Sequence, residues 1–396
     1  MQVLREAAPP SAPAPEVERE LAGRLPARPG HAVVLTGVRR SGKSILQAQL
    51  MRRCRGAFHC NFEDTRLHGL AAEDFPALLD LIEEFAPGKA PAFLDEVQEV
   101  EGWQRLVRTL LDRGRAVCVT GSNASLLGRE VGVRLTGRHL SFEVLPFSYP
   151  EYLEFTGRRP GGASLEGWLD DGGFPSYLRE GSPQVLQELL RDIVHRDIVA
   201  RHHLRETRHV MNLALFLLAN TGQPISLQRL TKVLAVPTVA QTGRYVEHLQ
   251  DAYVLFAVPK FSPSFKRRVI APNKYYAVDN GLRRANSPQA SPDVGHRLEN
   301  AVYLGLRRLG QAVSYASEKD AWECDFVTED RAIQVCARLT AENRRREVEG
   351  VVRGARLPGR RRPLILTLDQ RDRLVLDGIE IEVRPAWEWL MEPRPG

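Results

Sequence analysis

The chain has 396 residues, of which 43% are hydrophobic and 26% charged, a composition typical of globular proteins with more than one domain. Its longest apolar run, residues 213–219, is far shorter than the ~20 residues of a membrane-spanning helix, which excludes such a helix. The five cysteines are widely spread, which argues against a disulfide framework and against a zinc site. Because the N-terminus also lacks the order of a signal peptide, we expect a cytoplasmic protein without a membrane partner.

The net charge of +6 is concentrated near the C-terminus. Between positions 331 and 373 there are twelve arginines and five acidic residues, a local excess of +7. The rest of the chain is therefore close to neutral, and an attraction for polyanions is expected in the C-terminal region.

Residues 1–15 are rich in proline and alanine and cannot bury enough apolar surface to become ordered, so we expect a disordered tail. From residue 16 to residue 150, apolar runs alternate with stretches of helical periodicity. The five runs are residues 31–37, 57–62, 91–96, 116–122 and 139–145. Apolar strands joined by helices predict an α/β fold with a parallel sheet that is covered on both faces.

Three further segments are expected after residue 150. Residues 151–205 have the pattern of helices interrupted by glycine and proline. Residues 206–286 have the pattern of three helices and two short strands. Residues 287–396 return to mixed helices and strands, which indicates another α/β unit.

Residues 37–44, with the sequence GVRRSGKS, fit the phosphate-loop pattern at every fixed position and follow the first apolar run. Backbone N–H groups of such a loop wrap a polyphosphate at the N-terminus of the next helix. Lys43 would reach the β- and γ-phosphates, and the Ser44 hydroxyl would ligate Mg²⁺. The residues expected to bind ATP here are Gly37, Arg40, Ser41, Gly42, Lys43, Ser44 and Ile45.

Two acidic residues, Asp95 and Glu96, end the third apolar run. Burying acidic side chains at the end of a strand costs free energy unless a cation lies beside them or they take part in catalysis. We expect Asp95 to hold Mg²⁺ through water and Glu96 to polarise the water that attacks the γ-phosphate. After the next strand, Ser122 or Asn123 is expected to orient the water, with Thr120 as a weaker candidate, and Ser122 is also expected at the nucleotide. A helix N-cap at Ser122 or Asn123 is the alternative interpretation.

Arg138 lies just before the fifth apolar run. In oligomeric ATPases an arginine at this point reaches the γ-phosphate of the neighbouring subunit and stabilises the charge of the transition state. Arg134 is the second candidate. The alternative for either residue is a solvated surface charge.

These motifs resemble those of the AAA+ class of P-loop ATPases, and within it a bacterial and archaeal group with a C-terminal domain of unknown function. The resemblance runs from about residue 33 to residue 389. Its other matching segments include LTGRH at 135–139, GGFPSYL at 172–178, YYAVDNGLRRA at 275–285 and ECDFV at 323–327.

This resemblance implies a fold for every part of the chain. It implies an AAA+ ATPase domain at 16–150 with sheet order 5-1-4-3-2, a helical lid at 151–205, a winged-helix domain at 206–286, and a PD-(D/E)XK nuclease-like domain at 287–396. It also implies a ring of subunits, which we expect to be a hexamer, because AAA+ sites lie between neighbouring chains.

Two groups of residues are expected to contact DNA. On the last helix of the winged-helix segment, Gln241 and Arg244 face outward, and Lys266 and Arg267 follow in the next hairpin. The alternative is that this segment serves only in packing or oligomerisation. In the terminal domain, Arg344, Arg345 and Arg346 could bind the phosphate backbone, or they could simply be a solvated face.

The nuclease-like domain departs from its motif. Glu299 and Asp325 occupy acidic positions, but the last two motif positions read Gln334 and Cys336. An amide is a poor Mg²⁺ ligand and a thiol cannot replace the motif lysine, so we expect no cleavage.

The sequence therefore predicts an ATP-hydrolysing, Mg²⁺-dependent ring ATPase that binds DNA through its C-terminal half. The alternatives are an ATP-gated metal-dependent nuclease, and a slow ATP-binding switch that recruits a protein partner.

Overall fold

The computed structural model describes residues 16–25, 30–122, 135, 137–287, 294–319 and 321–392. The expected tail at 1–15, as well as Asn123 and Arg134, lies outside these described residues. The chain divides into two compact units, Met1–Leu145 with Asp251–Tyr253, and Pro146–Gln250 with Val254–Gly396. In the described ranges no helix is both long and apolar enough to cross a membrane.

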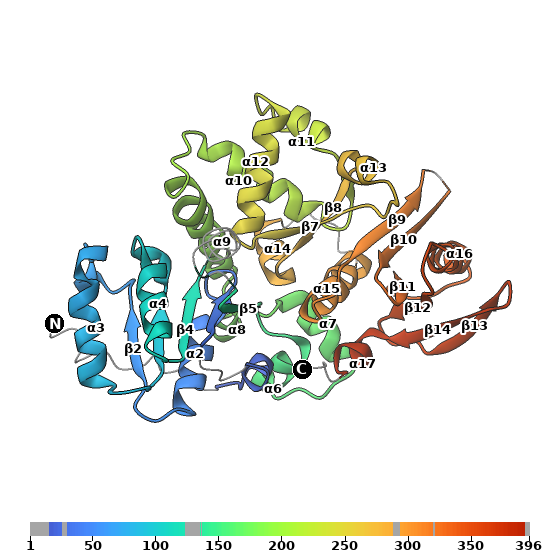
Figure 1. Ribbon diagram of the computed structural model, residues 1–396. Helices are drawn as coiled ribbons and strands as arrows, with labels where there is room; N and C mark the ends of the chain where they lie inside the picture. Colours follow the sequence, from blue (N-terminus) through green and yellow to red (C-terminus); the bar gives the residue numbers. More distant parts are fainter. Residues whose placement is uncertain are drawn as a thin grey trace. The chain divides into compact units, whose positions relative to one another are not determined.

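The first unit, whose strands β2 and β4 are labelled in Figure 1, contains a parallel sheet. The strand order of this sheet is β2-β3-β4-β1-β5. Its strands are β1 (Ala32–Thr36), β2 (Phe58–Asn61), β3 (Ala92–Asp95), β4 (Val117–Gly121) and β5 (His139–Glu143). The order is the expected 5-1-4-3-2 counted from the other edge, so the α/β fold and the parallel sheet of this unit are confirmed. Because β1, β3 and β4 are parallel, their carboxyl ends meet at one edge of the sheet.

Helices cover both faces of this sheet. Buried apolar residues of α3 (Phe75–Phe85) and α4 (Trp103–Asp112) pack on one face. Helix α2 (Lys43–Arg52) packs on the other face. Four short 3₁₀ helices complete the described part of this unit, namely η1 (Glu20–Gly23), η2 (Thr65–Leu67), η3 (Ala72–Asp74) and η4 (Val97–Glu99).

The second unit begins with a run of helices. These are α6 (Tyr149–Thr156), α7 (Gly162–Asp171), α8 (Pro175–Glu180), α9 (Pro183–Asp192) and the π-helical η6 (Ile193–Ala200). Ser148 begins α6 with a capping box, in which its hydroxyl accepts from the Glu151 N–H while the Glu151 carboxylate accepts from the Ser148 N–H. This local pattern explains why a helix starts there.

A small sheet with strand order β6-β8-β7 lies next in the chain. Its strands are β6 (Pro224–Ile225), β7 (Leu255–Val258) and β8 (Asn273–Ala277), and the neighbouring helices are α10 (Thr207–Ala219), α11 (Leu227–Val233), α12 (Val239–Asp251) and α14 (Asn280–Asn286). The three helices and two strands predicted from the sequence are therefore present. Strand β6, helix α14 and helix α13 (Phe265–Ile270), which lies between β7 and β8, were not predicted.

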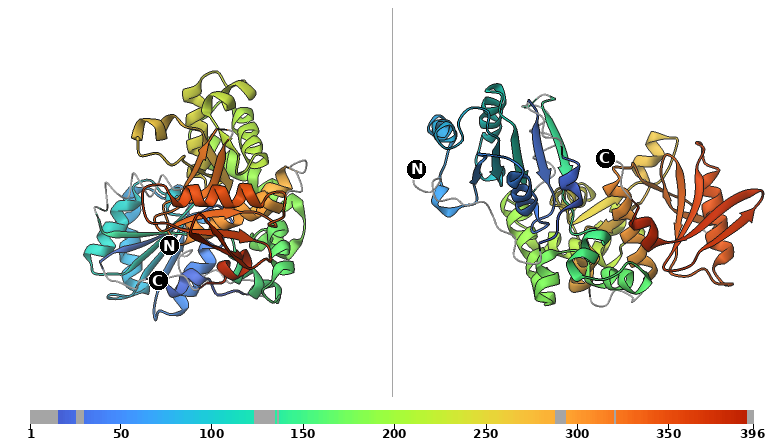
Figure 2. Two further views of the ribbon diagram at one scale, coloured as in Figure 1. Left: turned by 90° about the vertical axis from the view of Figure 1, so that its right-hand side faces the viewer. Right: turned by 90° about the horizontal axis from the view of Figure 1, so that it is seen from below.

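The C-terminal part contains a mixed sheet with strand order β13-β14-β12-β11-β10-β9, coloured orange to red in Figure 2. Its elements are α15 (Val294–Arg308), β9 (Ser314–Glu318), β10 (Trp322–Val327), β11 (Arg331–Val335), α16 (Arg344–Ala355), β12 (Arg362–Thr367), β13 (Asp372–Leu376), β14 (Ile379–Pro385) and α17 (Ala386–Leu390). Val351 and Val352 of α16 pack on this sheet. The expected mixed α/β character is confirmed, although β13, β14 and α17 were not predicted.

Candidate functional site

The predicted phosphate loop connects β1 to α2, and its glycines are required by geometry. Gly37 has φ 147°, and a Cβ at this position would lie 2.1 Å from the carbonyl oxygen of Val144. Gly42 caps α2 in the left-handed conformation with φ 96°. Other side chains would be strained at both positions. Of the remaining residues expected at the nucleotide, Arg40 and Ser41 lie in the loop, and Ser44 and Ile45 in the first turn of α2.

The Lys43 ammonium group is buried inside this loop. Its Nζ donates to the carbonyl oxygens of Gly37 and Val38, at 3.1 and 3.2 Å. It also lies 3.9 Å from Oε1 of Glu96. The loop therefore holds one fixed positive charge where a polyphosphate would be wrapped.

Asp95 lies at the carboxyl end of β3 and is almost fully buried. Its carboxylate accepts hydrogen bonds from the hydroxyl groups of Thr120 and Ser44. Burial raises the pKa of Asp95, and the neighbouring charge of Glu96 raises it further. A cation beside this carboxylate would offset both effects, and the oxygens of Asp95 and Ser44 are donors that Mg²⁺ prefers. The residues present thus fit the expected metal.

Glu96 follows Asp95 in a left-handed conformation with φ 50°, which is uncommon for a residue other than glycine. The Thr120 hydroxyl accepts a hydrogen bond from the backbone N–H of Glu96 at 2.9 Å. The Glu96 carboxylate accepts from the Gln98 side chain and lies near Lys43. The structure therefore brings Lys43, Asp95 and Glu96 together at the carboxyl ends of the strands.

Arg19 is a residue of this site that the sequence analysis missed. Its buried guanidinium group donates to the carbonyl oxygens of Ser41 and Leu145, both at 2.7 Å. It thereby links the loop to the residues that follow β5. Its position outside every motif explains the omission, because its role depends on contacts 22 and 126 residues away.

Ser122 directly follows β4, and its hydroxyl is buried. This hydroxyl makes no hydrogen bond to any residue in the described part of the chain. Its position at the same sheet edge leaves it available to a ligand, but the companion residue Asn123 is not among the described residues.

Arg138 lies at the amino ends of the strands, opposite the carboxyl ends where the phosphate loop begins. It directly precedes β5, whose first residue His139 pairs with Ala32, the first residue of β1. Its Nη1 forms an ion pair with Oδ1 of Asp112 at 2.5 Å. Since the phosphate loop follows the carboxyl end of β1, Arg138 is held away from the phosphate loop of its own chain.

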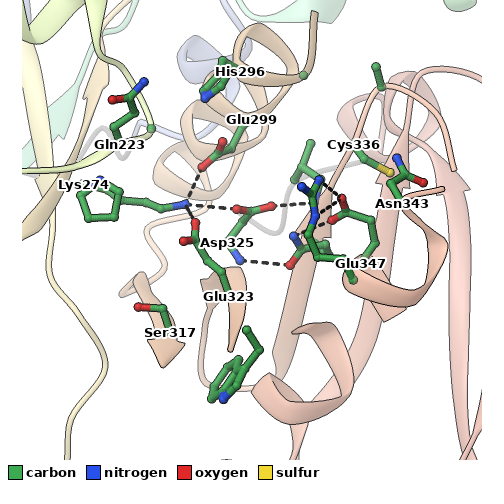
Figure 3. Close-up of a pocket in the computed structure, with 18 of the residues that line it drawn as sticks. Gln223, Lys274, His296, Glu299, Ser317, Glu323, Asp325, Cys336, Asn343 and Glu347 are labelled. Atoms are coloured by element: carbon green, nitrogen blue, oxygen red, sulfur yellow. Dashed lines mark hydrogen bonds and ion pairs between the residues drawn. The ribbon is translucent and has the colours of Figure 1, made fainter. Parts of the chain in front are cut away.

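The second unit contains a pocket of about 850 Å³ that includes the residues at the nuclease-like motif positions (Figure 3). Lys274 of β8 lies among the carboxylates of Glu299, Glu323 and Asp325. Burial raises the pKa of Glu299 to about 7. The same burial would lower the pKa of Lys274, but the carboxylates raise it well above its usual value.

The departures from the motif also line this pocket. Gln334 donates from Nε2 to Glu347 at 2.8 Å and accepts from the Asp325 N–H at 3.3 Å. Burial raises the pKa of the Cys336 thiol to about 12, which keeps it neutral. Sequence analysis missed Lys274 and Glu347. A lysine within the apolar segment NKYYAV was the available signal, because an unpaired charge in such a strand is costly.

The residues expected to contact DNA lie on three helices, α12, α13 and α16. Gln241 is bound to the Tyr245 hydroxyl of its own helix at 2.5 Å, whereas Arg244 is exposed. Lys266 and Arg267 are exposed on α13, beside three apolar side chains that are also exposed.

The three neighbouring arginines of α16 do not act as one surface. Arg344, Arg345 and Arg373 line a groove of about 770 Å³ formed with β13. Arg353 and Arg356 line it too, but they form ion pairs with Glu349 and Asp377 of the same groove. Arg346 instead binds Glu347, at 3.1 Å from Nε and 2.5 Å from Nη2.

Comparison with known proteins places this geometry in a family. A family model described as an AAA domain matches residues 29–153, and one described as a domain of unknown function, DUF8612, matches residues 163–293. An uncharacterized protein of Methanocaldococcus jannaschii is 30% identical over 395 residues, covering 91% of this chain and 88% of the relative. The chain belongs to the family of this archaeal protein. The AAA domain matched at residues 29–153 implies nucleotide binding and an enzyme of the ATPase type.

Other similar proteins add little about activity. An uncharacterized protein of Haemophilus influenzae is 27% identical over 381 residues, covering 91% of this chain and 94% of the relative. Among solved structures, the Orc1 protein of Aeropyrum pernix in complex with DNA is 14% identical, with a TM-score of 0.29, and covers 68% of this chain and 89% of that chain. Cdc6p of Pyrobaculum aerophilum is 13% identical, with a TM-score of 0.27, and covers 60% and 84%. These two scores are too low to support an argument.

Proposed function

We propose that this chain hydrolyses ATP to ADP and phosphate with Mg²⁺, using the AAA domain of the first unit. The observation that carries the proposal is the convergence of Lys43, Asp95, Glu96 and Thr120 at one sheet edge. A glycine-rich loop that served only as a turn, without binding nucleotide, would not require two acids and a hydroxyl beside its lysine.

Each residue has a separate role in this proposal. Lys43 neutralises the β- and γ-phosphates, and Glu96 accepts a proton from the attacking water while that water is oriented from Asn123. Ser44 and Asp95 hold Mg²⁺, which supplies positive charge to the phosphates when bound. Thr120 fixes the two acids relative to each other through its hydroxyl.

We further propose a cytoplasmic ring, as a hexamer, that binds DNA through its C-terminal half. The position of Arg138 supports assembly, because this side chain lies at the sheet edge opposite its own phosphate loop and could serve a neighbouring subunit. The arginine-lined groove of α16 and β13 supports binding of a polyanion. In this proposal residues 151–205 act as a lid, 206–286 as a winged helix and 287–396 as a nuclease-like domain without cleavage.

Phosphate release and binding of a labelled ATP analogue test the proposed activity. Lys43→Ala should lose binding, whereas Glu96→Gln should bind ATP and lose about 10²- to 10⁴-fold in turnover. Lys89→Ala, at an exposed lysine of the same unit, is the matched control. Wild-type turnover in Glu96→Gln would exclude the proposed base. Tight binding with turnover that stays negligible, with or without DNA, would favour a nucleotide switch.

A further inference from the structure

A lysine fills the centre of the acidic cluster in the second unit (Figure 3). Its Nζ lies 3.0 Å from Oε1 of Glu299, 2.6 Å from Oε1 of Glu323 and 3.1 Å from Oδ1 of Asp325. Lys274 comes from β8, Glu299 from α15, and the other two acids from β10. Elements that are far apart in the sequence thus direct three carboxylates at one ammonium group.

This ammonium group is surrounded by carboxylates and buried from solvent. Of its three N–H donors, two are accepted by Glu299 and Asp325, and the Glu323 carboxylate forms an ion pair with the same group. The Lys274 side chain is 1% exposed. A lysine that stabilises a phosphorane must offer a donor to the reacting group, so this arrangement differs from that of a catalytic lysine.

The ammonium group also occupies the point where a divalent cation would be bound. Carboxylates hold Mg²⁺ by converging on it at ~2.0–2.1 Å, and here the convergence point of the three carboxylates is the lysine nitrogen. A dication would be repelled at this distance by the positive charge of Lys274. Two of the carboxylates are further fixed, since Asp325 Oδ2 accepts from the Val335 N–H at 3.0 Å and Glu299 accepts from the Tyr276 hydroxyl at 2.6 Å.

The residues at the nuclease-like motif positions are independent evidence that this pocket does not bind a divalent metal. At position 334 an amide replaces the acid, and its two ends are bound to Glu347 and to the Asp325 N–H. At position 336 a neutral thiol replaces the motif lysine. The pocket thus lacks one metal ligand and contains a cation of its own.

We infer that Lys274 is a built-in cation that takes the place of a divalent metal in this pocket. The acidic cluster is therefore held together without metal, and it joins β8, α15 and β10 instead of cleaving a phosphodiester. This inference does not depend on the proposed ATPase activity.

Binding of Mn²⁺, measured by electron paramagnetic resonance and by the thermal shift of the full chain, tests this inference. All proteins carry Asp95→Asn and are free of nucleotide, so that the first unit contributes no metal site. The parent should bind no Mn²⁺ at the pocket. Lys274→Met should gain a Mn²⁺ site whose affinity is at least tenfold higher than that of any Mn²⁺ binding detected in the parent. Mn²⁺ should also raise the melting temperature of this variant. Adding Asp325→Asn should abolish the gain.

Two results would overturn the inference. If the parent binds Mn²⁺ and Asp325→Asn removes that binding, Lys274 is the neighbour of a working metal site. Nicking of supercoiled plasmid with Mn²⁺, lost in Lys274→Met, would establish the same conclusion. A folded Lys274→Met protein that gains no Mn²⁺ site would show that the cluster is not a cation site.

Lys274→Met leaves three carboxylates unpaired and could fail to fold. In that case the same two measurements are made on the double variant Lys274→Met/Glu323→Gln, which has one negative charge fewer. Folding of either variant only when Mn²⁺ is present supports the inference. Lack of any Mn²⁺ effect on the folded double variant overturns it.

Discussion

The Thr120 hydroxyl accepts a hydrogen bond from the backbone N–H of Glu96 at 2.9 Å, and it donates one to the carboxylate of Asp95. One side chain of β4 therefore fixes both acids at the end of β3. Glu96 has φ 50°, a conformation that costs energy for this residue and persists only when its surroundings hold it. We infer that Thr120 positions Glu96, the proposed catalytic base.

Thr120→Val should reduce ATP turnover by about tenfold or more while ATP binding changes little. Valine keeps the shape of the side chain but removes the acceptor for the Glu96 N–H, and an unsatisfied buried group costs about 1–3 kcal/mol. Steady-state phosphate release gives kcat and KM. Thr120→Ser, which restores the hydroxyl, should recover most of the turnover. Equal rates for Thr120→Val and wild type would mean that the hydroxyl has no part in positioning Glu96.

Much of the nucleotide site could be predicted because its residues follow strands in fixed patterns. The phosphate loop and the Asp95-Glu96 pair are local signals, and a parallel sheet brings strand ends together. Thr120 is a weaker candidate from sequence than its neighbours, because a threonine at a strand end has many ordinary roles. Arg19 carried no local signal, since its partners Ser41 and Leu145 are distant in sequence.

The unpredicted hairpin of β13 and β14 had a clear signal that was overlooked. Residues 379–384 alternate between apolar and polar side chains directly after Asp377-Gly378, and the apolar run 374–376 precedes this pair. Both turn residues have positive φ, 52° and 74°, and an Asp-Gly turn between alternating strands is the strongest short-range sign of a hairpin. The acidic pocket is different, because no local pattern reveals that a lysine from β8 reaches acids of α15 and β10.

DNA binding, if it uses the groove of α16 and β13, should depend on Arg344 and Arg345 and not on Arg346. Arg344→Ala/Arg345→Ala should lower the slope of log affinity against log salt by about 0.9 for each DNA phosphate that the variant no longer neutralises. Fluorescence anisotropy across a salt series measures this slope. Arg346→Gln is the matched control, because Arg346 binds Glu347 in the structure. An unchanged slope in the double variant would move the DNA surface elsewhere, with Lys266 and Arg267 the next candidates.

Asp279 should make stability depend on pH. Its buried carboxylate accepts from the N–H groups of Gly173 and Leu282, and burial raises its pKa to about 6 from the ordinary 3.8. The folded chain therefore keeps a proton that the unfolded chain has lost, so the free energy of unfolding falls as pH rises from about 4 to 6. This difference in pKa corresponds to about 3 kcal/mol.

Asp279→Asn removes this titration, so its stability deficit relative to wild type should shrink across that pH range. Chemical denaturation at pH 4, 5, 6 and 7 measures the deficit. A deficit that stays constant would mean that Asp279 is already ionised at the lower pH in the folded chain.

Arg138 is held by Asp112 at the sheet edge opposite its own phosphate loop. If it completes the site of a neighbouring subunit, Arg138→Ala should bind ATP normally and lose about 10³- to 10⁵-fold in hydrolysis. Lys43→Ala should also be inactive, but for a different reason, because its phosphate loop is damaged while its Arg138 is intact. Mixing these two inactive proteins creates some interfaces in which both parts work.

Recovery of phosphate release after mixing, followed against the ratio of the two variants, would therefore show that the site is shared between chains. Asp112→Asn/Lys43→Ala should complement as well as Lys43→Ala, because the ion pair with Asp112 is not part of the transition state in this proposal. Subunit exchange must be checked by pull-down of differently tagged chains. If the chains exchange and no activity returns, Arg138 does not act across subunits, and Arg134 becomes the residue to test by the same mixing.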